Sequence, residues 1–96
     1  MSKKIKWLRL ALSDLNQLIG YIARDNPDAA TKVAERIWET TRMLSNNPAM
    51  GKPGRVPGTR EMVVTGTSYI VPYRVVANEV QILRVLHGSR KWPEKF

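Results

Sequence analysis

The densest set of reactive side chains lies in a basic and aromatic run near the end of the chain. His87 is the one histidine, and Arg90, Lys91 and Trp92 follow it closely. A histidine can act as general acid or base near neutral pH, and cations can stabilise negative charge that develops on a phosphate. The basic and aromatic triplet also suits contact with RNA, with a phosphate-rich cleft or with an acidic protein segment. The run therefore predicts an anionic partner.

Each of these residues also has a purely structural interpretation. His87 suits a partly buried ring at the end of a strand, and Trp92 can pin the tail to a sheet. Arg74 and Arg84 alternate with valines, so they are expected to point outward as solvated or Glu-paired side chains. Arg60 lies next to a glutamate and can support the loop before it. Both interpretations remain open at this level.

Composition excludes several kinds of chemistry. With no cysteine, disulfide scaffolds, thiolate zinc sites and cysteine nucleophiles are ruled out. One histidine, without clustered serine and aspartate, leaves little room for a hydrolase triad or a His-ligated metal. We therefore expect no metal and no cofactor. The 96 residues predict one domain, 1–96, with a small core that a permanent partner would help to complete.

The formal charge of +8 favours polyanionic partners such as nucleic acid, the ribosome, anionic lipid or an acidic protein. A plainer alternative is a solvated surface that keeps the chain soluble. No apolar run reaches the roughly 20 residues that a membrane span needs, and the N-terminus has no signal-peptide stretch. We expect a cytoplasmic protein without a membrane partner.

Two amphipathic helices are expected in the first half of the chain. Apolar residues recur at steps of three and four on both sides of Asn26. The first helix is capped by Ser13 or begins a little earlier, and it ends near Asp25. Asn26 caps the second helix, Pro27 takes its first position, and the helix continues to about Asn46. The connection is so short that the helices must form an antiparallel hairpin.

The rest of the chain reads as strands. Alternation in residues 3–10 predicts a short N-terminal strand, and the Pro- and Gly-rich segment 47–58 predicts a loop. Three more strands joined by short turns predict an antiparallel meander: residues 60–65, 69–76 and 80–86. Pro72 has no N–H to donate, which indicates a bulge or a gap at that point.

The predicted fold class is α+β in the order β-α-α-β-β-β. The simplest way to bury both the helical stripes and the apolar sheet face is to pack the hairpin on one side of the meander. The other face of the sheet, or its concave edge, is then expected to be free for function.

This order, together with several short motifs, resembles the RelE/ParE superfamily, the toxins of bacterial type II toxin–antitoxin modules. The motifs are RVPGTRE from Arg55, YRV from Tyr73, ILRVLH from Ile82, and the flanking Trp7 and Trp92. The resemblance implies a cognate antitoxin whose C-terminal segment wraps the toxin in a hetero-oligomer. Operator DNA would be reached only through the antitoxin.

The superfamily implies two mechanisms. RelE-like members enter the ribosomal A site and cleave mRNA without a metal, using basic side chains and a C-terminal aromatic to promote attack by a ribose 2′-hydroxyl. ParE-like members poison DNA gyrase and have no established catalytic centre. If this chain is RelE-like, the resemblance and the neighbouring basic residues assign catalysis to Arg60, His87, Arg90, Lys91 and Phe96.

The RelE pattern is incomplete in this chain. Ile70 stands where the middle strand should carry a cation, and Glu61 and Val63 stand at the lysine positions of the first meander strand. Arg60 is one step away, and neighbouring residues of a strand point to opposite faces. We therefore favour a ParE-like toxin that poisons gyrase over an mRNA endonuclease. A basic RNA-binding or structural domain is a third possibility.

In the ParE-like case, basic and aromatic residues are expected to bind the target or the antitoxin. These residues are Arg60, Arg74, Arg84, Arg90, Lys91 and Trp92.

Overall fold

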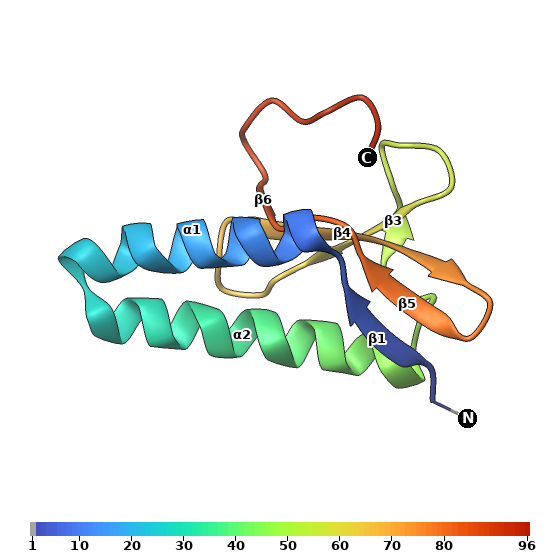
Figure 1. The fold of residues 1–96 in the computed structure, drawn as a ribbon, viewed down its shortest axis with the longest axis horizontal. Helices are drawn as coiled ribbons and strands as arrows, with labels where there is room; N and C mark the ends of the chain where they lie inside the picture. Colours follow the sequence, from blue (N-terminus) through green and yellow to red (C-terminus); the bar gives the residue numbers. More distant parts are fainter. Residues whose placement is uncertain (1) are drawn as a thin grey trace.

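A computed structural model describes residues 2–96 and confirms the α+β fold (Figure 1). In chain order, the elements are β1 (Lys4–Trp7), α1 (Arg9–Asp25), α2 (Pro27–Asn46), β2 (Lys52–Pro53), β3 (Arg60–Val63), β4 (Tyr69–Val76), β5 (Glu79–Ile82) and β6 (Leu86–His87). The helices form the expected antiparallel hairpin, and its turn extends beyond the end of the sheet (Figure 1).

The strands form one sheet in the order β1-β5-β4-β3-β2, and β6 pairs with β4 beyond the end of β5. β3, β4 and β5 are the predicted antiparallel meander. The N-terminal strand joins the sheet as a parallel neighbour of β5, with Ile5 opposite Val80. The strand expected over 60–65 ends at Val63, and the expected loop contains the two-residue strand β2, which pairs with β3.

The helix boundaries follow from capping. Asn26 accepts a hydrogen bond from the backbone N–H of Ala29 at 3.0 Å, and Pro27 begins α2, as predicted. For α1, the earlier of the two expected starts is correct. The helix begins at Arg9 with Leu8 in the N-cap conformation, so Ser13 lies inside the helix and does not cap it.

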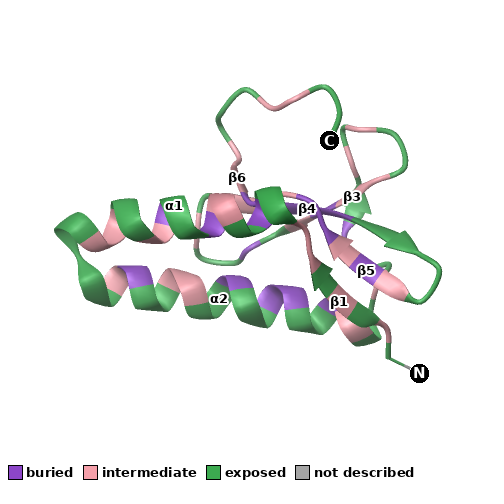
Figure 2. Ribbon diagram, in the orientation of Figure 1, coloured by how far each residue is buried: buried purple, intermediate pink, exposed green. Residues whose placement is uncertain are grey.

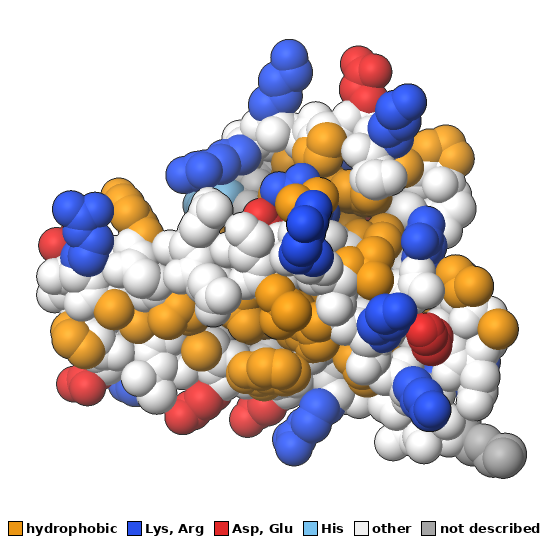
Figure 3. All heavy atoms as spheres, in the orientation of Figure 1, with side chains coloured by type: hydrophobic (Ala, Val, Ile, Leu, Met, Phe, Trp, Pro, Cys, Tyr) orange, Lys and Arg blue, Asp and Glu red, His pale blue; other side chains and the backbone are white. Residues whose placement is uncertain are grey.

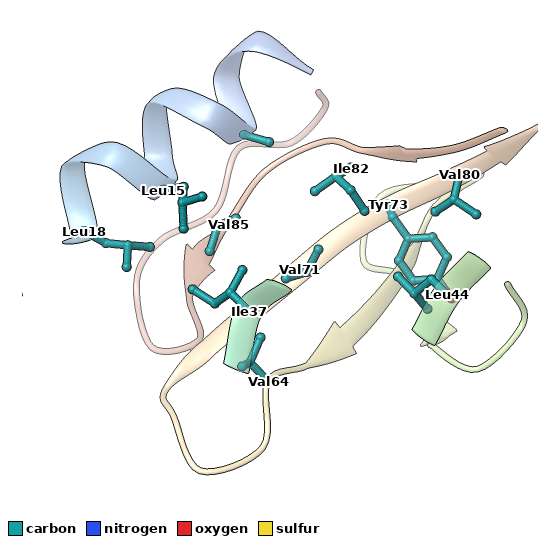
Figure 4. Packing of buried hydrophobic residues seen from close by; sticks show 11 residues of the cluster. Leu15, Leu18, Ile37, Leu44, Val64, Val71, Tyr73, Val80, Ile82 and Val85 are labelled. Carbon is teal, nitrogen blue, oxygen red and sulfur yellow. The ribbon is translucent and has the colours of Figure 1, made fainter. Parts of the chain in front are cut away.

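The core lies between the hairpin and the sheet (Figure 2). Ile37 and Leu44 of α2 point toward Val71 and Tyr73 of β4 (Figure 4). These four side chains are fully buried, because the period of the helix and the alternation of the strand present their apolar faces to each other. Among the described residues, neither helix is long and apolar enough to cross a membrane.

The expected irregularity at Pro72 is present on the neighbouring strand. Tyr73 pairs with Ile82 and Ile70 pairs with Leu86, so two residues of β4 face three residues, 83–85. This is a bulge of one residue, and it divides the continuous strand that was predicted over 80–86. Pro72 cannot donate to the ladder, and its carbonyl accepts the Leu83 N–H at 3.0 Å.

Candidate functional site

The bulge is fixed by a carboxylate from α1. Asp14 accepts two hydrogen bonds from the Arg84 guanidinium, at 2.7 and 3.0 Å, and a third from the Val85 N–H at 3.0 Å. The hydrogen bond that Arg84 donates to Asp14 raises the pKa of Arg84 above its ordinary value. A bidentate pair of this kind fixes geometry as well as charge. Arg84, predicted to contact a partner, is therefore held by Asp14 of its own chain, with its side chain partly exposed.

A groove runs between α1 and the segment that contains β6 and the turn after it. Its lining includes polar, aromatic and basic side chains from both walls: Asp14, Gln17, Tyr21, Arg24, Tyr69, His87 and Arg90. In Figure 3, blue Lys and Arg side chains lie beside the pale blue histidine above α1. The structure thus brings together three of the predicted site residues, Arg84, His87 and Arg90.

The His87 ring is oriented by the turn that follows it. Its Nδ1 accepts the Ser89 backbone N–H at 3.2 Å and lies 2.7 Å from the Ser89 hydroxyl. The ring also packs edge-on against Tyr69, with 5.6 Å between the centroids. Because Nδ1 is the acceptor, the hydrogen-bond network assigns the proton of the neutral ring to Nε2. His87 therefore offers a hydrogen-bond donor.

Within residues 2–96, the charged side chains of the groove that have no ionic partner are positive. Arg24 and Arg90 make no salt bridge within residues 2–96, whereas the one carboxylate of the lining, Asp14, is paired with Arg84. The arrangement suits binding of an anionic group.

Arg60 lies outside the groove, at the first residue of β3. It is paired with Tyr73, whereas His87 is paired with Tyr69, so the two positions are separated by about 13 Å along β4. The Arg60 guanidinium donates to the Gly51 carbonyl at 2.8 Å and to the Ala49 carbonyl at 3.4 Å. It therefore supports the loop before β3, which was the structural interpretation of this residue.

Tyr73 fixes the same loop by two hydrogen bonds. Its hydroxyl donates to the Pro48 carbonyl at 2.7 Å and accepts the Gly51 N–H at 2.9 Å. The side chain is fully buried, and this burial raises the pKa of the Tyr73 phenol above its ordinary value. The loop is thus hydrogen-bonded to the core through one phenol.

The tail and the loop before β3 cover part of the sheet's other face. The Trp92 ring stacks under the Arg55 guanidinium at 3.7 Å and donates its N–H to the His87 carbonyl at 3.1 Å. The Arg55 backbone N–H donates to Glu61, whose side chain is buried on that face. The expectation that this face is free is therefore wrong at Glu61 and Pro72, which are buried, whereas Arg74 of the same face is exposed. Trp92 pins the tail, as its structural interpretation proposed.

The remaining predicted residues lie outside the groove. Arg74 donates to its cross-strand neighbour Gln81 at 2.7 Å on the sheet surface. Lys91 and Phe96 are exposed on the tail and do not line the groove. Within residues 2–96, no group of three His, Asp or Glu side chains is arranged to hold a metal ion.

Sequence reasoning missed the α1 wall of the groove. Asp14, Gln17, Tyr21 and Arg24 recur at steps of three and four, so they form a second row on the helix beside its buried stripe. Attention to that second row could have identified Tyr21 and Arg24.

The solved structures that this chain resembles include a ParDE system and a RelBE complex. A solved structure titled "Chromosomal ParDE TA system from P. aeruginosa" matches with a TM-score of 0.80 and 31% identity, over 88% of this chain and 94% of that chain. The RelBE2 toxin–antitoxin complex of Mycobacterium tuberculosis matches with a TM-score of 0.63 and 26% identity, over 91% of this chain and 99% of that chain. These similarities define the class as a RelE/ParE-type toxin.

The family within that class is defined by sequence. The family model described as "ParE toxin of type II toxin-antitoxin system, parDE" matches residues 5–92. The chain therefore belongs to the ParE toxin family. It is also 42% identical over 92 residues to "Putative toxin Y4kP" of Sinorhizobium fredii, covering 96% of this chain and 95% of that protein.

Proposed function

We propose that this ParE-family toxin arrests bacterial growth by poisoning DNA gyrase and that a cognate antitoxin neutralises it in the cytoplasm. The toxic unit is the single domain 1–96. The observation that carries the proposal is the separation of Arg60 from His87 and Arg90 in a chain of the ParE family.

A nuclease needs a converged set of groups. Attack by a 2′-hydroxyl requires a base, cations on the scissile phosphate and a proton donor for the leaving oxygen, all around one phosphate. Here Arg60 is bound to loop carbonyls, and Lys91 and Phe96 lie outside the groove that holds His87 and Arg90. This distribution supports a toxin that acts by binding its target.

The antitoxin part of the proposal is supported by exposed apolar surface and by charge. Leu12 and Trp38 are 42% and 47% exposed, and Figure 3 shows hydrophobic side chains gathered along the helices. Such surface on a chain of charge +8 suits an acidic segment that folds on binding. In this proposal operator DNA is contacted through the antitoxin.

The test is induced expression of the chain in a bacterial host, with mRNA integrity and the DNA-damage response followed together. We expect filamentation and a DNA-damage response while mRNA stays intact. In-frame mRNA cuts within minutes, without a DNA-damage response, would overturn the gyrase assignment. Normal growth with neither response would overturn the claim that this chain is an active toxin.

The second candidate is a ribosome-dependent mRNA endonuclease. It is favoured by the similarity to the RelBE2 complex and by the shared groove of His87 and Arg90. In that case His87→Ala and Arg90→Ala would abolish the mRNA cuts, whereas the conservative variant Arg90→Lys would retain part of the activity.

A further inference from the structure

We propose that the outer face of the sheet, on the side away from the helical hairpin, binds the sugar–phosphate backbone of duplex DNA. The inference deepens the proposed function and rests on it for the source of the DNA, because gyrase acts on duplex DNA. It concerns contact with the backbone alone, whereas recognition of the operator sequence stays with the antitoxin. The distribution of charge, the register of the strands and the exposure of the cations support it.

The whole net charge of the chain lies outside the hairpin. Residues 9–46 carry five Lys or Arg and five Asp or Glu, so the two helices have no net charge. Residues 1–8 carry three lysines and no acid, and residues 47–96 carry eight basic and three acidic side chains. Red acidic side chains lie along the lower edge of the molecule, where α2 lies (Figures 1 and 3). A polyanion is therefore attracted to the strands and the tail more than to the helices.

The register of three strands places cations in one row. Lys6 of β1 is paired with Gln81 of β5, and Gln81 is paired with Arg74 of β4. Paired residues of neighbouring strands share a face, and the hydrogen bond of 2.7 Å from Arg74 to Gln81 agrees with this. Because the adjacent residues Trp7 and Tyr73 pack in or against the core, the row points away from the hairpin. Strands lie about 4.8 Å apart, so the backbones at Lys6 and Arg74 are about 10 Å apart.

The cations of this face are available to a partner. Lys6 and Arg74 are exposed, and neither makes a salt bridge within residues 2–96. Lys4 is also exposed and lies two residues before Lys6, so it points to the same face. Its cross-strand neighbour Glu79 is the one carboxylate of the described strands β1, β4 and β5. Three cations against one carboxylate leave this part of the face positive.

The basic surface continues beyond the part that the tail covers. Lys52 of β2 is exposed and is paired with Glu61, so it lies on the same face. The Arg55 side chain, stacked on Trp92, is 46% exposed. From Lys6 to Lys52 the sheet crosses four strand spacings, or about 19 Å. At 3.4 Å per nucleotide, this width corresponds to roughly six base pairs of duplex.

The side chains of this face suit a phosphate backbone better than a protein segment. Val76 is the one exposed apolar side chain that β1, β4 and β5, as described, place there. Protein interfaces depend on a centre of buried apolar and aromatic anchors. Phosphate oxygens need cations and hydrogen-bond donors, which Lys6, Arg74 and the Gln81 amide supply.

The same face favours a duplex over a single strand. Proteins that bind single strands stack the bases on exposed aromatic rings. The aromatic side chains of β1 and β4 are Trp7, Tyr69 and Tyr73, and all three pack in or against the core. A duplex keeps its bases stacked on each other and presents phosphates to a flat surface, so it needs no such ring.

The experiment is a fluorescence-anisotropy titration of a labelled duplex of about 20 base pairs with the full chain. The site variant is Lys6→Gln/Arg74→Gln. The matched control is Lys32→Gln/Arg42→Gln, which removes the same charge from exposed positions of α2. All four side chains are exposed, and circular dichroism verifies that each variant is folded. Titrations at about 0.15 M salt limit the reach of distant charges to about 8 Å, and a salt series gives the number of phosphates contacted.

We expect the site variant to raise the Kd of the duplex at least tenfold, and the α2 control to change it less than twofold. The slope of log K against log salt should fall by about 1.8 in the site variant, since each phosphate contact contributes about 0.9. Equal Kd values for the site variant and the control would overturn the surface.

Two competitors test the chemistry of the ligand. An unlabelled duplex of unrelated sequence should displace the probe as well as the probe's own sequence does, because the backbone is the same. Displacement that depends tenfold on sequence would overturn a pure backbone contact. A single-stranded RNA of the same length that displaces the probe at lower concentration than the duplex would overturn duplex DNA as the partner.

The titration contains no gyrase, so its outcome is separable from toxicity. A chain that poisons gyrase, and whose site variant binds the duplex as tightly as the wild type, overturns the DNA-binding surface alone. A chain that shows the expected loss in the site variant but never arrests growth overturns the proposed function alone.

Discussion

Two regions of β4, around Tyr73 and around Tyr69, use the same residue types for opposite purposes. In the first region, Tyr73 and Arg60 donate to loop carbonyls and leave little for a partner. In the second region, Tyr69 and His87 border an open groove, in which Arg24 and Arg90 have no ionic partner among the described residues. The first region stabilises the fold, and the second region leaves polar and charged groups open to a partner.

The comparison shows that an arginine must be assigned by what it contacts. Arg60 was predicted as a catalytic and binding residue, but it contacts backbone oxygens of its own chain. Arg84 is held by Asp14, and only Arg90 of these three lines the groove without a carboxylate partner in the part of the chain that the structure describes. Four predictions test this division.

The largest loss of stability is expected in the region around Tyr73. Tyr73→Ala removes a fully buried ring and should lower the free energy of unfolding by about 3–5 kcal/mol. Tyr73→Phe, which loses only the hydroxyl, should cost about 1–3 kcal/mol. Arg90→Ala should cost less than about 0.5 kcal/mol, because its side chain is exposed. Urea unfolding measures all three, and equal losses for Tyr73→Ala and Arg90→Ala would remove the distinction.

An intermediate loss of stability is expected at the bulge, which lies between the Tyr73 region and the Tyr69 region. Asp14→Ala removes the acceptor of Arg84 and of the Val85 N–H, so we expect a loss of about 1–3 kcal/mol in urea unfolding. Asp25→Ala, at an exposed position near the end of α1, is the control and should change stability little. A loss at Asp14 no larger than at Asp25 would contradict the role of Asp14 in fixing the bulge.

A smaller loss of stability is expected as the pH rises. Because the pKa of Tyr73 is raised in the folded state, its neutral form is favoured there, and the unfolded chain loses this proton first, near pH 10.0. The contribution of Tyr73 is thus complete below pH 10.0 and is lost as pH rises toward the folded-state pKa, by up to about 1.4 kcal/mol per pH unit. Unfolding measured from pH 8 to 11 should show this additional loss in the wild type and not in Tyr73→Phe. The same pH dependence of the free energy of unfolding in the wild type and in Tyr73→Phe would refute it.

The smallest expected effect is a gain in stability. Gly20→Ala should raise the free energy of unfolding by about 0.5–1 kcal/mol, because alanine favours the helix and open space surrounds the site. Urea unfolding measures this gain. An unchanged or lower free energy of unfolding in Gly20→Ala would contradict it.

Most of the fold could be predicted from local patterns. Asn26 and Pro27 defined the helical turn, because capping depends on neighbouring residues alone. An irregularity in the ladder at Pro72 was also predictable, since the missing N–H is a property of that residue. Its form, a bulge that divides the neighbouring strand into β5 and β6, was not predictable, because the residues between them are held by Asp14, about 70 positions earlier in the chain.

The site was less predictable than the fold. His87 and Arg90 were identified because they are close in sequence. The opposite wall, with Tyr21 and Arg24, comes from a helix more than 60 residues away, and only the tertiary structure brings it beside them. The role of Arg60 depends on carbonyls of an irregular loop, and no periodicity encodes their direction.

The most direct test of the central claim uses the purified chain with purified DNA gyrase and, separately, with ribosomes translating a defined mRNA. Our account predicts that the chain inhibits gyrase and accumulates cleaved DNA, while the mRNA remains intact. Unaffected gyrase together with ribosome-dependent cuts in the mRNA, abolished by Arg90→Ala, would contradict it.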